Sequence, residues 1–503
     1  MDVTDKLAAG AGPDEALVEE SILPTSLNQR PIGMLGYAWM WVGIAVIIAT
    51  YSLGAGGVEG GLPLAQVIAV IALANLVIGL FMLLTADIGT EHGLSFAVYL
   101  RAPFGVRGTH LPALSRGIVA AMWFGIQTYL GALALNGIGQ YFLGFDSWVL
   151  WYAAFAILQM ANTAMGIKSV ERLAALAAPA IIAISVWMYF TLEGVAETKG
   201  INIWTWRGTG EISVVVLFIS NMAFWSTMAI DIPNLTRFIR TEPGARRYLR
   251  RNRNVLLAQL VALPVTQALI AGLGAVSFIA TGNWNPVEVI QAQAQGQGFS
   301  LVLLLALVVL AQWSTNNSAN LIPSALTFIN FAPRVINYRM AVLIAGVVGT
   351  LCMPWLLLEN LFVFLGYYGA FLSAIGGIMI ADYYLLRRRR LNVPALYRMD
   401  GQFRYLGGFN PAGLIAWVLA GGVAAWQVQY AILIGFPLGL VLYLALMKGA
   451  VLRRYPQAEI DSGFSDDFLA TSVGVSWVYR GQGAFVRANA DALAQSDARR
   501  EDL

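Results

Sequence analysis

The sequence predicts an all-α polytopic membrane protein with twelve transmembrane helices, and three observations lead to this fold class. Of the 503 residues, 58% are apolar and only 12% are charged, whereas soluble domains average about 25% charged residues. The apolar residues gather in long stretches, each sufficient to cross about 30 Å of hydrocarbon as a helix. Finally, the basic residues fall almost entirely in alternate loops between these stretches.

Each expected span follows from the requirement for about twenty predominantly apolar residues. The spans are predicted at residues 34–58, 63–87, 115–140, 148–166, 171–195, 211–234, 254–281, 298–330, 338–356, 358–385, 412–428 and 430–450. The first 33 residues are polar and acidic, without the apolar core of a cleavable signal peptide. We therefore expect one membrane domain at 34–455, preceded by a polar segment at 1–33 and followed by a loosely ordered tail at 456–503.

The orientation in the membrane follows from the basic residues, because cytoplasmic loops retain positive charge. Of the 31 Lys and Arg residues, only Lys199 and Arg207 fall in odd-numbered loops. Arg116 is assigned to the loop after the second span in this count. Both termini are therefore expected in the cytoplasm, and the run at 387–390 is interpreted as a topological signal rather than as a nucleic-acid site.

Three spans contain polar or helix-breaking residues that a lipid-facing helix would not carry. The first span holds Gly and Tyr-Ser within 41–57, the sixth is polar from Ser220 to Asn234, and the eighth is polar from Leu310 to Pro323. Interrupted helices expose carbonyl and N–H groups that bind ions and substrates near the membrane centre. Ordinary kinks and hydrogen bonds between helices remain the alternatives. Spans one and six lie five apart, as two inverted five-helix repeats require.

Helical spacing groups several of these polar side chains into faces. Trp123 and Gln127 are four residues apart in the third span, so an indole plane and an amide share one face. In the eighth span Ala311, Ser314 and Thr315 form a stripe of oxygen ligands suited to a hard cation. Asn316 and Asn320 form a second stripe, turned away from the first. One helix could therefore serve an ion and a ligand separately.

Other chemistries find less support in the sequence. No glycine-rich phosphate loop precedes a lysine, so an ATP-driven pump is not indicated. Asp231 in the sixth span is a candidate proton relay, although it could equally cap a helix that restarts at Pro233. A nucleophile with its base, as an enzyme would need, and a repeated pore motif, as a channel would need, are not found.

Several ordered motifs give the chain a specific resemblance to a known family. They include Arg30, Trp41, Arg101-Ala-Pro-Phe-Gly, Trp123-Phe-Gly-Ile-Gln-Thr, Gly282-Asn-Trp-Asn-Pro, Trp313-Ser-Thr-Asn and Ala381-Asp-Tyr-Tyr-Leu-Leu followed by four arginines. From about residue 20 to 455 the chain resembles the nucleobase:cation symporter-1 family, and within it the bacterial hydantoin permease type. This resemblance implies a LeuT-like inverted repeat, with repeats at about 34–195 and 211–385 and two added helices at about 412–450.

The resemblance also implies roles for individual residues. The family's two stacking indoles fall on Trp123 and Trp225, and its substrate-binding amides fall on Gln127 and Asn320. Its sodium site falls on main-chain carbonyls and hydroxyls of the following residues: Gly43, Val46, Ala311, Ser314 and Thr315.

Two positions depart from the hydantoin permease type. Ile47 replaces an amide and Phe224 replaces a glycine, so the pocket is expected to be less polar beside the first span and tighter beside Trp225. Bulky 5-substituted hydantoins are therefore disfavoured as substrates. Uracil, another pyrimidine or purine, and allantoin fit these departures better.

The expected function is symport of a small planar nitrogen heterocycle with a cation, favoured as sodium, across the cell's inner membrane. A proton-coupled nucleobase permease and an amino-acid or amine symporter of the same fold are the alternatives. No cofactor other than the coupling ion is expected, and the expected partners are the small-molecule substrate and the lipid bilayer. Neither nucleic acid nor an obligatory protein partner is indicated.

Overall fold

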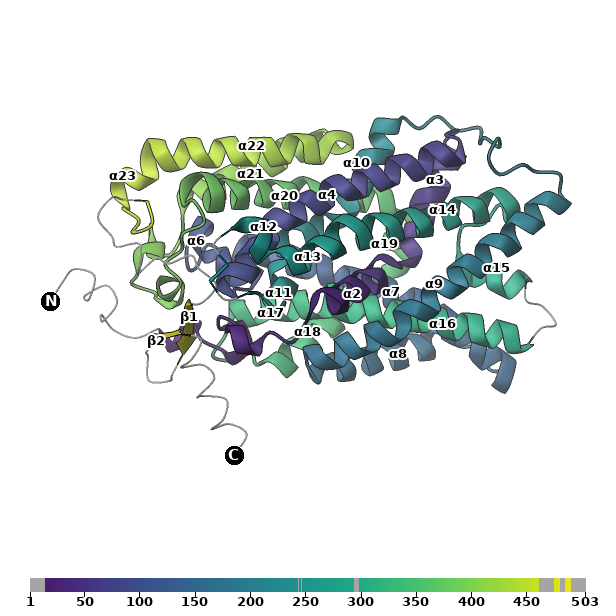
Figure 1. Cartoon of the computed structure of the whole chain (residues 1–503), viewed down its shortest axis with the longest axis horizontal. Coiled ribbons are helices and arrows are strands. Elements are labelled where there is room, and N and C mark those ends of the chain that lie inside the picture. The colour runs from purple at the N-terminus through teal and green to yellow at the C-terminus, as the bar shows by residue number, and fades with distance from the viewer. Residues whose placement is uncertain are drawn as a thin grey trace.

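A computed structural model describes residues 14–242, 244–245, 247–293, 298–460, 475–479 and 485–489. The chain forms an elongated bundle whose helices run mostly along one long axis (Figure 1). Helices α21 and α22 pack against α20 along one edge of the bundle, and α8, α16 and α18 lie toward the opposite edge (Figure 1).

Helices lie over every stretch at which the sequence predicts a span. They are α2 (Met34–Ala45), α3 (Ile48–Glu59), α4 (Leu64–His92), α7 (His110–Leu143), α8 (Trp148–Ala164), α9 (Ile167–Thr198), α10 (Val214–Asp231), α13 (Arg253–Leu257), α14 (Leu263–Thr281), α16 (Gly298–Asn316), α17 (Ile322–Phe331), α18 (Tyr338–Leu351), α19 (Pro354–Glu359), α20 (Leu361–Ile380), α21 (Pro411–Trp426) and α22 (Ala431–Leu446). Shorter elements connect them: α5 (Phe96–Tyr99), α6 (Arg101–Phe104), α11 (Pro233–Thr236), α12 (Tyr248–Arg251), α15 (Pro286–Gln293), α23 (Leu452–Arg454), β1 (Val475–Tyr479) and β2 (Phe485–Asn489).

Within the described ranges, seven helices are long and apolar enough to cross a membrane, and eight if the bent pair α2 and α3 forms one span. The helices α18 and α21 are apolar but shorter. A polytopic membrane fold is thus confirmed, whereas the number of twelve crossings stays a prediction.

The first span is broken, as its sequence predicts. Helix α2 ends at Ala45, α3 begins at Ile48, and the two axes meet at 60°. Between them Val46 has φ −84° and ψ 78°, and Ile47 has an extended backbone. This geometry takes main-chain groups near Val46 out of the helical hydrogen-bond pattern and makes them available to a ligand.

The sixth and eighth spans depart from the α-helix in different ways. The sixth span is interrupted at its end, because α10 is continuous from Val214 to Asp231 and a new helix, α11, begins at Pro233. Proline is compatible with the first turn of a helix, so the break falls at the end of the span. The eighth span contains a π-helical turn at Asn317–Leu321, between α16 and α17. Such turns are frequent at functional sites.

Close packing of α3 against α14 depends on two glycines. A Cβ on Gly54 would lie 1.7 Å from the carbonyl oxygen of Ala271, and one on Gly274 would lie 2.2 Å from that of Tyr51. Small residues allow helix backbones to approach this closely, which is a common way of packing helices in membranes. The second half of the broken first span is therefore held rigidly against α14.

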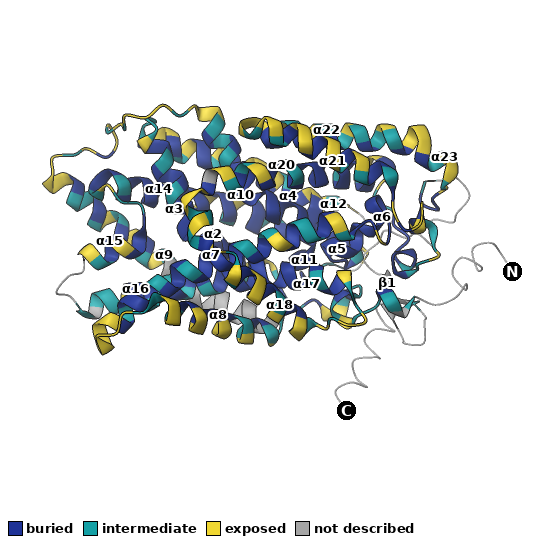
Figure 2. Ribbon diagram, turned by 180° about the vertical axis from the view of Figure 1, so that it is seen from behind, coloured by how far each residue is buried: buried dark blue, intermediate teal, exposed yellow. Residues whose placement is uncertain are grey.

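The outer surface of the bundle is largely apolar. Buried residues fill its interior and exposed residues lie on the outward helix faces (Figure 2). Leu73, Leu80, Val265, Leu343 and Val418 are among the large apolar side chains that lie on this surface. An outward apolar surface of this extent is what a lipid environment requires of a helical bundle.

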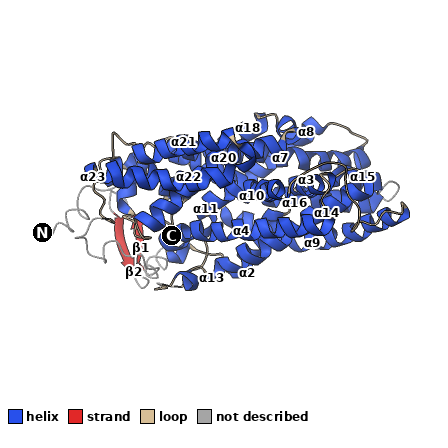
Figure 3. Cartoon of the chain, turned by 90° about the horizontal axis from the view of Figure 1, so that it is seen from above, coloured by secondary structure: helices blue, strands red, loops and turns tan. Residues whose placement is uncertain are grey.

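The polar N-terminal segment and the C-terminal residues meet at one end of the bundle, where the hairpin β1–β2 also lies (Figure 3). The hydroxyl of Tyr397 donates to the carbonyl of Ile22 at 2.6 Å, and the Tyr397 ring lies 5.0 Å from that of Phe485 in β2. Glu459 accepts from the main-chain N–H of Asn392 at 2.8 Å. In the tail predicted at 456–503, residues 456–460 and the hairpin are therefore ordered, contrary to expectation; its other residues lie outside the described ranges.

Arg101 is a buried cation at this end of the bundle. Its guanidinium donates to Oδ1 of Asn330 at 2.7 Å and to the carbonyl of Leu396 at 3.1 Å, and it lies over the ring of Tyr397. Burial lowers the pKa of Arg101 to about 10, so it remains charged near neutral pH. Arg101 thereby joins the loop after α4 to the end of α17.

Candidate functional site

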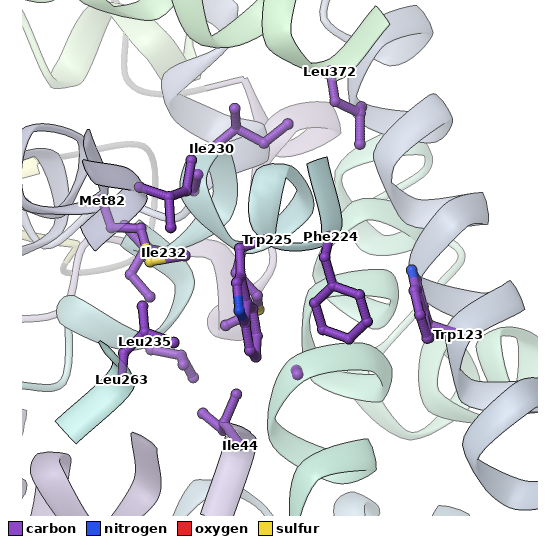
Figure 4. Packing of buried hydrophobic residues seen from close by; sticks show 14 of the residues in the cluster. Ile44, Met82, Trp123, Phe224, Trp225, Ile230, Ile232, Leu235, Leu263 and Leu372 are labelled. Carbon is purple, nitrogen blue, oxygen red and sulfur yellow. The ribbon is translucent and has the colours of Figure 1, made fainter. Parts of the chain in front are cut away.

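A row of aromatic rings lies in the interior of the bundle. The ring of Phe224 is 5.2 Å from that of Trp123 and 5.2 Å from that of Trp225, measured between centroids, and both pairs are edge-to-face. Figure 4 shows Phe224 between the two indoles, with Trp123 projecting from α7 and the other two from α10. The two indoles predicted from the sequence are thus close together, and Phe224 fills the space between them.

Further aromatic side chains extend this row, and sequence reasoning did not assign them to the site. The ring of Trp41 on α2 lies 5.6 Å from Trp225, and that of Phe364 on α20 lies 6.0 Å from Trp123. Trp41 is one of the ordered motifs that carry the family resemblance, and this was the only sequence feature that could have drawn attention to it. Phe364 lies among apolar residues at the start of α20, so nothing in its sequence context distinguishes it.

Two amides lie in the same interior region. Gln127 is 1% exposed, and its Oε1 has no hydrogen-bond partner within the described part of the chain. Asn320 lies in the π-helical turn, and its Nδ2 donates to Oδ1 of Asn316 at 2.7 Å. A buried amide oxygen without a partner is costly, so Gln127 is suited to accept a hydrogen bond from a ligand.

The candidate cation ligands meet where α16 crosses the break in the first span. The hydroxyl of Thr315 donates to the carbonyl of Gly43 at 2.6 Å and to that of Ala311 at 3.0 Å. Ser314 is fully buried, and its Oγ has no partner within the described residues. Thr315 thus contacts two of the other four predicted ligands directly, and the adjacent Ser314 contributes an oxygen that has no partner in the described part of the chain.

The break itself supplies the remaining residues named from the sequence. Val46 and Ala311 line a cavity of about 30 Å³, which is enough for a single water-sized species. Ile47 follows Val46 and is buried in the break. The structure thus brings Val46 beside Ala311, while Ile47 contributes only an apolar side chain.

A buried ion pair lies next to these groups. Arg116 was assigned to a loop from the sequence, but this is wrong: it lies in α7, where its guanidinium is 2.8 Å from the carboxylate of Asp231. Arg116 also donates to the main-chain carbonyls of Thr227 at 3.1 Å and Ala319 at 3.3 Å. It therefore joins α7, the end of α10 and the π-helical turn that carries Asn320.

Comparison with known proteins identifies the family. Residues 24–451 match the family model described as permease for cytosine/purines, uracil, thiamine, allantoin. The chain belongs to this family. It is 29% identical to the hydantoin permease of Microbacterium maritypicum, over 90% of this chain and 93% of that one. The allantoin permease of Bacillus subtilis is 27% identical, with 88% and 96% covered.

Solved structures agree with this assignment. A nucleobase-cation-symport-1 family transporter, Mhp1, in a closed conformation with bromovinylhydantoin bound, has a TM-score of 0.83 at 27% identity, with 90% of this chain and 100% of that one covered. Its inward-facing conformation has a TM-score of 0.80 at 28% identity, with 91% and 99% covered. The resemblance inferred from the motifs is confirmed, and the chain is a multi-pass membrane permease by family.

Proposed function

We propose that the protein is a secondary symporter that imports a small planar nitrogen heterocycle together with sodium. The observation that carries this proposal is the contact of Thr315 with Gly43 and Ala311. A cation bound there would touch both the broken first span and α16, and α16 leads within one turn to the amide of Asn320. Because the two sites share one helix, occupancy of either can bias the conformation that the other requires.

The proposal includes the topology on which alternating access depends. Twelve crossings, with inverted repeats at about 34–195 and 211–385, would place the broken first span opposite α10. Both termini would lie in the cytoplasm, because the basic residues fall almost entirely in the even-numbered loops and in the two terminal segments. The membrane would be the cell's inner membrane.

The proposed substrate site is lined by Trp123, Trp225, Gln127 and Asn320, and Ile47 limits its size. Phe224 lies between the two indoles, so a ring would stack on both of them only after the phenyl ring turns aside. Indoles suit a flat ring, and amides suit the donor and acceptor groups of a lactam or ureide edge. The relatives are named as permeases for hydantoin, allantoin, purine and uracil, and hydantoin, allantoin and uracil each carry such an edge. We favour uracil, related nucleobases and allantoin over bulky hydantoins because Phe224 occupies the inter-indole space.

An uptake screen tests this function. Cells expressing the protein would receive radiolabelled nucleobases, allantoin and hydantoin in sodium medium and in choline medium. We expect uptake of at least one of these compounds, stimulated by sodium. If uptake does not depend on sodium but is lost when the pH gradient is removed, the coupling ion is the proton, and Asp231 becomes the candidate residue that carries it.

Replacing Trp123 or Trp225 by alanine should weaken substrate binding about tenfold or more. Each aromatic stack contributes about 0.5–1.5 kcal/mol beyond simple area burial, and about 1.4 kcal/mol corresponds to a factor of ten. The affinity of purified protein for its best substrate from the screen gives the measurement. Trp426 is an exposed tryptophan on α21, so Trp426→Ala provides a matched control. Normal affinity in both site variants would exclude stacking on these indoles.

Phe224→Gly should widen the specificity of the transporter. Removing the phenyl ring opens the space between the two indoles, so a 5-substituted hydantoin with an aromatic substituent should compete at least tenfold better than in the parent. Competition against uptake of the best small substrate gives the measurement. Glycine itself perturbs helices, so Phe371→Gly would not separate that effect from the loss of a ring. Phe224→Ala removes the same ring without introducing a glycine, and it should reproduce the gain. If neither variant admits the larger ligand, Phe224 does not limit the pocket.

A further inference from the structure

A chain of buried polar side chains leads from α8 to the candidate substrate site. It comprises Gln159 on α8, Thr128 on α7, Asn316 at the end of α16 and Asn320 in the π-helical turn. All four side chains are buried, and each is hydrogen-bonded to the next. The sequence had pointed to Asn316 and Asn320 as one stripe, but Gln159 and Thr128 are on other helices.

Main-chain carbonyls fix the orientation of two amides in this chain, those of Gln159 and Asn316. Gln159 donates from Nε2 to the carbonyl of Phe155 at 3.3 Å, and Asn316 donates from Nδ2 to the carbonyl of Phe124 at 3.0 Å. A carbonyl can only accept, so each contact identifies the amide nitrogen without ambiguity. In agreement, Nδ2 of Asn316 also donates to Oε1 of Gln159 at 2.8 Å.

The consequence for Asn320 follows directly. Because the nitrogen of Asn316 points toward α7 and α8, its Oδ1 must point the other way, where it accepts from Nδ2 of Asn320 at 2.7 Å. The amide of Asn320 is thereby held by its nitrogen. The bond to Asn316 uses the nitrogen of Asn320 and leaves its Oδ1 available to a ligand. The buried Oε1 of Gln127 has no donor within the described part of the chain.

We infer that Gln159, Thr128 and Asn316 are positioning residues that turn Asn320 so that its carbonyl oxygen meets the substrate. With Gln127 the site then presents two amide oxygens, and the ligand it selects is a lactam or ureide ring that supplies N–H donors to them. This inference rests on the proposed function, and it specifies that the substrate donates the hydrogen bonds and the two amides accept them. A ring whose corresponding nitrogens are methylated supplies no donor to either oxygen and leaves the buried Oε1 of Gln127 unpaired, so such ligands are rejected.

The test measures binding to purified protein of uracil, hydantoin and allantoin and of their N-methylated derivatives. The parent protein should prefer the unmethylated member of at least one pair by about tenfold or more. In Asn316→Asp a carboxylate oxygen replaces the nitrogen that donates to Phe124, so the carbonyl of Phe124 repels the side chain and residue 316 no longer holds Asn320 in a fixed orientation. Affinity for the unmethylated ligand should fall, and the preference over the methylated one should shrink toward unity.

Two variants separate positioning from general damage to the fold. Asn317→Asp makes the same chemical change in the same turn, but Asn317 bonds to Asn162 rather than to Asn320, so it should keep the preference. Thr128→Val removes one hydroxyl and leaves the carbonyl contacts, so the preference should narrow less than in Asn316→Asp.

The outcomes are distinct. A parent protein that binds none of the heterocycles would overturn the proposed function and this inference together. A parent protein that discriminates, with Asn316→Asp or Thr128→Val binding and discriminating equally well, would overturn the inference alone. Loss of preference in Asn317→Asp to the same degree as in Asn316→Asp would also overturn it, because the effect would then not follow the hydrogen-bonded chain.

Discussion

Arg116→Leu should lower the free energy of unfolding by about 3–5 kcal/mol, because it leaves Asp231 as an uncompensated buried charge. The guanidinium and the carboxylate are each 1% exposed, so water cannot replace the lost partner. The measurement is the denaturation midpoint of purified protein in detergent. Replacing both residues by leucine should recover most of the loss, since apolar residues of similar size often substitute for a whole buried pair.

An exposed pair provides the control for this prediction. Arg250 and Glu242 form an ion pair with side chains 62% and 40% exposed, and breaking such a pair costs about 0–1 kcal/mol. Arg250→Leu should therefore leave the midpoint almost unchanged. If the double variant of Arg116 and Asp231 proves no more stable than the single one, the pair does not compensate charge in the way that its geometry indicates.

Replacing Ser314 and Thr315 together by alanine should abolish the effect of sodium on substrate affinity. The coupling free energy between two ligands is commonly about 1–3 kcal/mol, or a factor of about 5–150. Both hydroxyls are removed from the proposed cation site, whereas Trp123, Gln127 and Asn320 are untouched. Substrate titrations in sodium and in choline should therefore give equal affinities in the variant, both near the choline value of the parent.

Ser318→Ala offers a matched control on the same helix. Its hydroxyl donates to the carbonyls of Ser314 and Thr315, at 3.0 and 3.2 Å, and belongs to neither proposed site. This variant should keep most of the sodium effect. If sodium still raises substrate affinity after the hydroxyls of Ser314 and Thr315 are removed, the cation does not bind where α16 crosses the first span.

The span positions and the broken first helix could be predicted because hydrophobic length and glycine content act locally along the chain. The face that pairs Ser314 and Thr315 with Ala311 was equally accessible, since it depends only on helical spacing. Family resemblance added Gly43, which is distant in sequence, and its contact with Thr315 agrees with that addition.

Contacts between different helices could not be read from spacing. Gln159 lies in a largely apolar span, and nothing in its neighbours indicates that it bonds to Asn316. Arg116 was misassigned because its charge suggested a loop, whereas its carboxylate partner is 115 residues away in sequence. Phe224 was expected to narrow the pocket, but its place between two indoles depends on how α7 and α10 pack.

The central claim is that sodium and the heterocycle bind to one protein and strengthen each other. The most direct test titrates the purified parent protein with its best substrate in sodium and in choline, and then with sodium in the presence and absence of that substrate. Thermodynamic linkage requires the two affinity ratios to be equal. We expect both ratios to exceed about fivefold, within the usual range of such coupling. Equal substrate affinities in sodium and choline, with no effect of substrate on sodium binding, would contradict sodium symport by this protein.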